Sequence, residues 1–178
     1  MICNTHIVEC LRNINVEPEA FSSKDINDEV NASIALIYNT GSCFYSAEED
    51  KPQWWAVDFK RIISISGYSI HSGGSATNNG WIYNWTFSTS IDNKTYKVVH
   101  GPAQNLNSEK TYMFSNFVNA RYIRIDGNSL WGSDRTTFAF HYVKIFGILK
   151  AINMKKYSCK ARKYLNIDII RMILVLCS

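Results

Sequence analysis

Two glycine-containing segments place a tryptophan beside amides and charged side chains. Trp131 is followed by Asp134 and Arg135, and Trp81 is preceded by two asparagines. The C–H face of a sugar can stack on a flat aromatic ring, while its hydroxyls pair with amide, carboxylate and guanidinium groups. The pattern therefore predicts loops that bind a carbohydrate. The residues to which we assign this role are Asn78, Asn79, Trp81, Trp131, Asp134 and Arg135.

A third polar segment, residues 38–42, carries Asn39 and precedes a short aromatic run. Asn39 joins the predicted ligand-binding set, because binding residues are common on loops that a rigid scaffold positions. The alternative is that Trp81 and Trp131 fold back and pack beneath their own loops. The sequence leaves both roles open.

Catalysis finds little support in the sequence. The four histidines belong to no catalytic motif, and neither HExxH nor GxSxG occurs. Most carboxylates lie in polar turns and give no pair of the kind that glycoside hydrolysis needs. Asp58 is the exception, because it lies within a strand pattern, and we expect it to pair with Arg121 or Arg124. The sequence predicts a protein that is not an enzyme and has no catalytic residues.

Metal and cofactor sites are also unsupported. The five cysteines are widely scattered, with no CxxC and no cysteine–histidine cluster at zinc spacing. Such a set favours free thiols in a reducing compartment. The first twelve residues do not have the pattern of a secretory signal. We predict no cofactor, no metal and a cytoplasmic location.

The charge of the chain is unevenly distributed. Residues 1–150 hold 13 Lys and Arg against 14 Asp and Glu, a net charge of −1, whereas residues 151–178 hold 6 basic residues and one acidic residue, a net charge of +5. The neutral body argues against nucleic-acid binding, which needs a dense basic surface. The apolar stretch at 167–177 is about half the ~20 residues that cross a bilayer. Together with the basic segment before it, this stretch could lie on a membrane surface as a helix. The alternatives are a helix docked on the body of the protein and an extension without a packing role.

Short β-rich runs bounded by Gly, Asn, Asp and Ser follow one another after residue 31, and this indicates an all-β fold. Alternation predicts that Trp54 faces away from the core, and it predicts a bulge at Gly67. The expected strands are Trp54–Phe59, Ile62–His71, Asn84–Thr89, Thr95–His100, Thr111–Phe114, Arg121–Ile125 and Thr137–Ile148. The expected core aromatics are Trp55, Phe59, Trp85, Phe87 and Phe146.

Five segments, taken in this order and spacing, resemble the coagulation factor V/VIII type C domain, also called the discoidin domain. They are Trp55–Phe59, Ile65–Ile70, Asn84–Tyr96, Ala120–Ile125 and Phe138–Gly147. The resemblance covers residues 23–149. Residues 1–22 are then an N-terminal extension or linker remnant, and residues 150–178 a basic and apolar tail that a helix would suit.

This resemblance implies a galactose-binding-like jelly-roll β-sandwich of about eight antiparallel strands. It also implies a non-catalytic recognition or adhesion module that binds glycans, anionic lipid headgroups or proteins through loops at one end. Those loops correspond here to Tyr38–Phe44, His71–Tyr83 and Asn128–Thr136.

Two departures from the family pattern matter. Members with a structural calcium often carry an Asp in the first loop and a Glu in the last strand, where this sequence has Tyr38 and either Tyr142 or Lys144. Calcium needs several hard oxygen ligands, so the resemblance implies no metal here. The disulfide that closes coagulation-type members has no counterpart just after Gly147.

The sequence is compatible with three functions. The first is a carbohydrate-binding module, and the second is an intracellular protein–protein interaction module that uses the same loops. The third is a binder of anionic membrane surfaces through Leu130, Trp131 and the basic tail. The expected partner is a glycan or a protein, with membrane contact less favoured and nucleic acid excluded. The ligand and the oligomeric state are not defined by the sequence.

Overall fold

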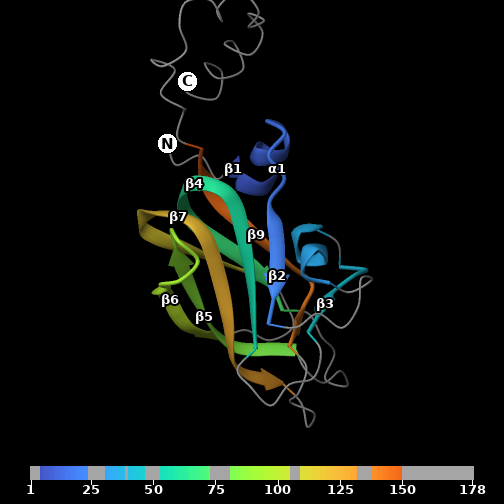
Figure 1. The fold of residues 1–178 in the computed structure, drawn as a ribbon. Coiled ribbons are helices and arrows are strands. Elements are labelled where there is room, and N and C mark those ends of the chain that lie inside the picture. Colours follow the sequence, from blue (N-terminus) through green and yellow to red (C-terminus); the bar gives the residue numbers. More distant parts are fainter. Residues whose placement is uncertain are drawn as a thin grey trace, which may run out of the picture.

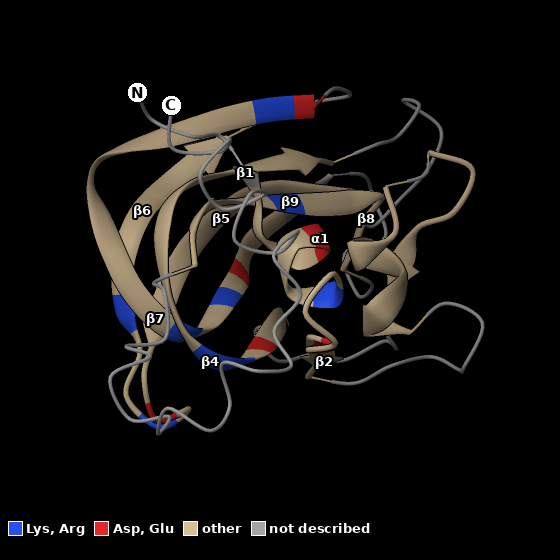
Figure 2. Ribbon diagram, turned by 90° about the horizontal axis from the view of Figure 1, so that it is seen from above, with Lys and Arg blue, Asp and Glu red and all other residues tan. Residues whose placement is uncertain are grey.

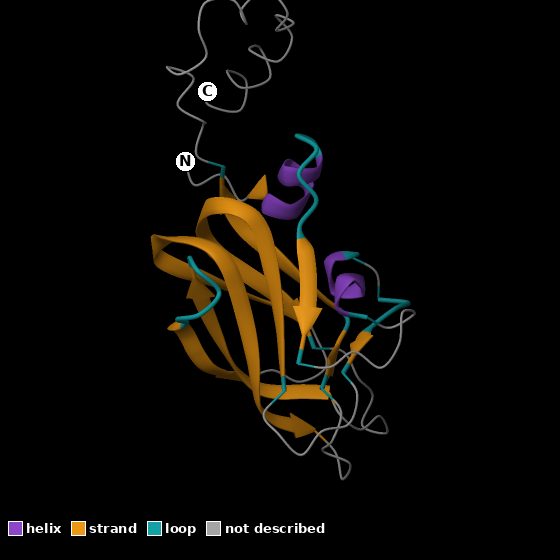
Figure 3. Ribbon diagram, in the orientation of Figure 1, coloured by secondary structure: helices purple, strands orange, loops and turns teal. Residues whose placement is uncertain are grey.

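The computed structural model describes residues 5–23, 31–38, 40–46, 53–72, 81–104, 109–131 and 138–149. Strands dominate these residues (Figure 3). In chain order the elements are β1 (Thr5–His6), α1 (Ile7–Arg12), β2 (Glu19–Ser22), the 3₁₀ helix η2 (Ala32–Leu36), β3 (Phe44–Tyr45), β4 (Trp54–His71), β5 (Trp81–Ser90), β6 (Lys97–Gln104), β7 (Glu109–Trp131), β8 (Ala139–Phe140) and β9 (Tyr142–Ile148).

Two long, bent strands, β4 and β7, connect the layers of the fold (Figure 1). The first part of β4 pairs with residues 122–126 of β7, and its second part pairs with residues 109–120 of β7 and with β9. The bend in β4 lies at Lys60, whose φ of 59° is in the left-handed region. Each long strand therefore belongs to both layers, whereas the sequence predicted two separate strands in each case.

One layer has the order β2, β4, β7, β5 and β6, and the other contains β9, β4 and β7, with β1 beside β9. This arrangement confirms the predicted all-β sandwich. Most pairs are antiparallel, and the β5–β8 pair is parallel, with Ala139 opposite Trp81. The predicted strand Thr137–Ile148 is divided between β8 and β9, because His141 forms a bend between them.

Aromatic and aliphatic side chains fill the space between the layers. Trp55, Phe59, Trp85 and Phe87 are fully buried, as the alternation predicted. Phe146 is different, because it is only partly buried and lies against the ring of His6, with ring centroids 6.3 Å apart. The segment before β2 also contributes to this core through α1, whose apolar residues Ile7, Val8 and Leu11 are fully buried.

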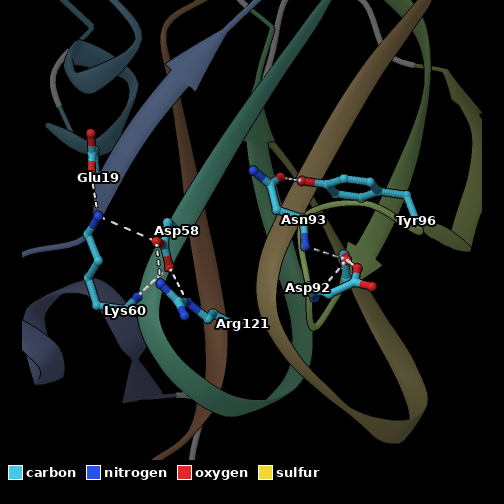
Figure 4. A network of polar contacts seen from close by, with 8 residues as sticks. Glu19, Asp58, Lys60, Asp92, Asn93, Tyr96 and Arg121 are labelled. Carbon is cyan, nitrogen blue, oxygen red and sulfur yellow. Dashed lines mark hydrogen bonds and ion pairs between the residues drawn. The ribbon is translucent and has the colours of Figure 1, made fainter.

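Charged side chains at the bend of β4 form the network drawn in Figure 4. Arg121 donates from Nε and Nη2 to the two carboxylate oxygens of Asp58, both at 2.9 Å, which confirms one of the two predicted partners. The Lys60 backbone N–H donates to the same carboxylate at 2.7 Å, and the Lys60 ammonium contacts Glu19. Burial alone would raise the pKa of Asp58, but the hydrogen bond from Arg121 and that from Lys60 lower it. This network stabilises the positive φ at the bend.

Basic and acidic residues are interspersed over the described ribbon rather than gathered by sign (Figure 2). Arg124 lies beside Asp126, and Lys144 beside Glu109. Within the described ranges, no helix has the length and apolar character needed to cross a membrane.

Candidate ligand-binding end of the sandwich

The described ends of the predicted loops meet at one end of the sandwich, which we call the loop end. It is defined by His71 at the end of β4, Trp81 at the start of β5, Trp131 at the end of β7 and Ala139 at the start of β8. Trp81 is the register partner of both Trp131 and Ala139. The loop end lies opposite β1 and α1 (Figure 1). Sheet register therefore brings together segments that are far apart in the sequence.

The first predicted loop is attached to the same end through His141 and β3. The His141 Nδ1–H donates to the backbone carbonyl of Ser42 at 2.9 Å, because a carbonyl oxygen can only accept. In a neutral ring, Nε2 then carries the free lone pair. Phe44 pairs with Phe140 in the short β3–β8 ladder, which holds the segment after Ser42 against the sandwich.

Trp81 lies at the base of the loop end and is only 4% exposed. Its ring contacts those of Tyr45 and His141, with centroids 5.9 and 5.1 Å apart. Its Nε1–H is buried and has no hydrogen-bond partner in the described part of the chain. The burial of the Trp81 ring fits a packing role, which was one of the two roles that the sequence left open. The indole N–H adds a polar group to the base of the loop end.

Two histidines meet beside Trp81. The rings of His71 and His141 are 5.0 Å apart between centroids, and His71 also lies 5.3 Å from the ring of Tyr142. Burial lowers the pKa of His71, and the neighbouring His141 lowers it further, so the neutral ring is favoured. The His71 Nδ1 and the hydroxyl of Ser72 are buried, and neither has a hydrogen-bond partner among the residues that the structure describes. The ends of β4 and β5 thus carry three buried polar groups, on His71, Ser72 and Trp81, that do not pair with one another or with any other described residue.

Sequence reasoning missed the two histidines as members of the site. They are separated by 70 positions and lie in no motif, so no local spacing marks them. They come together because β4 and β9 pair with His71 opposite Tyr142, the residue after His141. Only a correct prediction of that register would have found them.

A charged network lies next to the histidine pair. Glu109 accepts hydrogen bonds from Ser69, Tyr142 and Lys144 at 2.5, 2.9 and 2.8 Å. Burial alone would raise the pKa of Glu109, but these hydrogen bonds, first that from Lys144, lower it to about 2. The carboxylate is therefore ionised at neutral pH and paired with a cation.

The positions that the resemblance compared with a calcium site are also close to this network. The Lys144 ammonium lies 5.9 Å from the ring centroid of Tyr38 and 4.8 Å from that of Tyr142. Two phenols and an ammonium do not offer the carboxylate and carbonyl oxygens that calcium prefers. Among the described residues, no group of three or more His, Cys, Asp or Glu is placed to hold a metal ion.

Most of the predicted ligand-binding residues lie outside the described residues. These are Asn39, Asn78, Asn79, Asp134 and Arg135. For Trp131 the structure describes the backbone, paired with Trp81, but not the side chain. Their role in binding stays a prediction.

The fold and the loop end together define a jelly-roll β-sandwich with its connections gathered at one end. The family model of the F5/8 type C domain matches residues 19–140. The chain belongs to this family, as the resemblance predicted. The family is one of non-catalytic binding modules.

Solved structures with the same fold include three sugar-binding proteins. The family 32 carbohydrate-binding module of NanJ from C. perfringens, solved with galactose, has a TM-score of 0.63 and 19% identity, and the match covers 80% of this chain and 98% of that one. Chitosan-binding module 2 of a chitosanase/glucanase from Paenibacillus sp. IK-5, solved with chitotriose, has a TM-score of 0.60 and 14% identity over 72% and 95% of the two chains.

A third structure is a fucolectin from the serum of the striped bass, Morone saxatilis. Its TM-score is 0.60 at 17% identity, and the match covers 76% of this chain but 48% of that one. At these identities the three likenesses show a shared fold. A comparison with curated proteins found no match to this sequence.

Proposed function

We propose that this protein is a non-catalytic recognition module that binds carbohydrate at the loop end. The observation that carries the proposal is the convergence of three loop ends on one cluster, formed by His71, Trp81 and His141. Binding sites in such sandwiches sit on loops that the rigid sheets hold together. The relatives in fold that were solved with galactose and chitotriose support the choice of a sugar as ligand.

The chemistry of the described base suits a hydroxyl-rich ligand. The indole N–H of Trp81 is a donor, the hydroxyl of Ser72 is both a donor and an acceptor, and the neutral ring of His71 offers one of each. The amides and charged groups predicted on the loops would add the contacts that define which sugar is bound.

The same geometry argues against glycoside hydrolysis at this end. The carboxylate that the structure describes there is Glu109, which is ionised and bound to Lys144. A general acid must hold a proton near neutral pH, so its pKa must be raised rather than lowered. We therefore infer binding without catalysis.

The proposal is tested by screening the full chain against a glycan array and by titrating it with galactose and chitotriose in a calorimeter. We expect binding to at least one glycan, and at least a tenfold loss of affinity in Trp131→Ala and in Arg135→Ala. Lys94→Ala serves as the matched control, because Lys94 is exposed in the turn after β5, at the other end of that strand. It should bind as the parent does.

Two results would contradict the proposal in different ways. Full affinity in both loop variants would show that the ligand does not use these residues. If no glycan binds but a protein is retained specifically by the parent and released by the same variants, the loops serve protein recognition instead.

A further inference from the structure

Trp54, the first residue of β4, faces away from the core that its neighbour Trp55 fills. Trp54 is partly exposed, whereas Trp55 is fully buried. Its ring packs edge to face with that of Phe21 on β2, with centroids 5.8 Å apart and planes at 81°. This aromatic pair lies outside the buried core cluster and leaves part of the Trp54 side chain open to solvent.

An ion pair lies on the next strand of the same face. Asp126 of β7 is the register partner of Trp54. The Arg124 Nε donates to one carboxylate oxygen of Asp126 at 3.1 Å and lies 2.9 Å from the other in an ion pair. The guanidinium also covers the ring of Tyr96, 4.4 Å from its centroid. These contacts hold both charged groups in place, and the pair has no net charge. The Arg124 side chain remains 32% exposed.

A pair of amides continues this row toward the loop end. The Asn128 side-chain nitrogen donates to the Asn84 side-chain oxygen at 3.1 Å, which joins β7 to β5. Asn128 faces the same way as Asp126, because Gly127 between them faces the core, where an added Cβ would contact Phe138. Three residues further along β7 is Trp131, at the loop end itself.

These residues form one strip, which we call the Trp54 strip and define as Phe21, Trp54, Asn84, Arg124, Asp126 and Asn128. From Asp126 to Trp131 is five residues, or about 17 Å at the usual rise of a strand. That length is several times the width of one pyranose ring. The strip therefore continues along β7 to the loop end, and one sugar unit is too small to contact both Asp126 and Trp131.

We propose that the Trp54 strip is a second subsite, which binds the following units of an oligosaccharide whose terminal unit lies at the loop end. This inference rests on the proposed function and names its substrate class as chain glycans rather than single sugars. The aromatic ring of Trp54 offers a stacking surface, and the pairs Arg124–Asp126 and Asn84–Asn128, which carry no net charge, offer donors and acceptors held in place by their mutual contacts. Such a surface suits uncharged, hydroxyl-rich units.

The test compares chain lengths. The full chain is titrated with two uncharged series: N-acetylglucosamine and its β-1,4-linked oligomers up to the hexamer, and galactose and β-1,4-linked galacto-oligosaccharides. We expect affinity to rise with chain length in the series that binds. Trp54→Ala should remove that rise, a loss of roughly three- to tenfold for the longest oligomers, while the affinity for the single sugar stays unchanged. Trp54→Phe, which keeps a ring, should retain most of the rise.

Phe117→Ala is the matched control, since Phe117 is an exposed aromatic residue of β7 that lies outside the strip. It should bind every oligomer as the parent does. In NMR spectra, the indole N–H signal of Trp54, assigned through Trp54→Phe, should shift with long oligomers and not with single sugars.

The results that contradict the second subsite differ from those that contradict the proposed function. If the parent binds single sugars with no gain from longer chains, or if Trp54→Ala binds long oligomers as the parent does, the second subsite is wrong and the proposed function stands. If the parent binds no carbohydrate of any length, the proposed function and the second subsite are both wrong.

Discussion

At the scale of single residues, the core contains a short chain of polar groups that are paired with one another. The indole N–H of Trp85 donates to the hydroxyl of Tyr68 at 2.9 Å, and that hydroxyl lies 2.9 Å from Nδ1 of His100. Tyr68 is fully buried, and its ring is stacked on that of Phe87 at 4.3 Å. Burial raises the pKa of the Tyr68 hydroxyl and lowers the pKa of His100. The chain is therefore neutral, and it is complete only while Tyr68 keeps its hydroxyl.

We predict that Tyr68→Phe lowers the free energy of unfolding by about 1–3 kcal/mol, because it leaves the buried Trp85 donor without its partner. The measurement is chemical denaturation in urea. Tyr112→Phe is the matched control, since its hydroxyl donates to the Gln104 carbonyl at 3.2 Å in an exposed position, and it should change the free energy by no more than about 0.5 kcal/mol. Equal effects of the two changes would argue against the buried chain.

Single residues differ in how far the sequence could predict them. Alternation was enough for the buried positions of Trp55 and Trp85 and for the outward position of Trp54, because the side-chain period of a strand is fixed. Asp58 could be assigned to a charged partner because carboxylates within strands seldom stay unpaired. The meeting of His71 with His141 could not be predicted, because it depends on long-range register that no short pattern contains.

At the scale of elements, the sequence was enough to locate most strands, but it did not show that two pairs of predicted strands are the continuous strands β4 and β7. Polar or irregular residues interrupt alternation in the middle of β4 and β7, and such interruptions ordinarily mark the end of a strand. Here the chain bends instead, at Lys60 in β4 and between Ala120 and Tyr122 in β7, where the partner in β4 changes from Ile63 to Asp58. Both halves of each strand remain hydrogen-bonded, since the bend passes them to different layers. The predicted bulge at Gly67 is confirmed by the pairing with β9, where Ile65 lies opposite Gly147 and Gly67 opposite Phe146, so that β4 has one extra residue.

This bulge allows a test of how closely the strands approach. A Cβ at Gly67 would lie 2.8 Å from the Met113 sulfur and would also meet the Tyr112 carbonyl of the neighbouring strand. Since backbone cannot give way cheaply, Gly67→Ala should lower the free energy of unfolding by about 1–3 kcal/mol.

Ser66→Ala, at the position before the glycine, is the control for Gly67→Ala. The Ser66 hydroxyl is buried and has no hydrogen-bond partner in the described segments, so its removal should leave the free energy of unfolding within about 0.5 kcal/mol of the parent or raise it. Thermal denaturation of the two variants checks the pair. If Gly67→Ala is as stable as the parent, the strands are further apart at the bulge than the structure places them.

At the scale of the whole molecule, three partly buried histidines and the paired carboxylates make stability depend on pH in the same direction. Burial lowers the pKa of His6, His71 and His100 below the ordinary value of 6.5. In this range the unfolded chain binds more protons than the folded protein, so stability falls as the pH drops below about 6.5. A second fall should follow at lower pH, where Glu109 takes up its proton.

The second fall can be assigned to Glu109 by substitution. A free glutamate titrates near 4.5, whereas the pKa of the folded carboxyl is lowered to about 2, mainly by the hydrogen bond from Lys144, although burial opposes the shift. A lowered carboxyl pKa contributes stability that is fully present above about 4.5 and is lost as the pH falls toward about 2. Glu109→Gln lacks this contribution, so it should be less stable than the parent at pH 7. The difference in free energy of unfolding between the parent and Glu109→Gln should shrink between pH 4.5 and pH 2 in a series of urea denaturation experiments.

The control is Glu17→Gln, which removes an exposed partner of Arg12 and should differ little from the parent at any pH. If the difference caused by Glu109→Gln is the same at pH 7 and at pH 2.5, the network around Lys144 does not hold the carboxylate ionised, and a different set of groups causes the acid sensitivity.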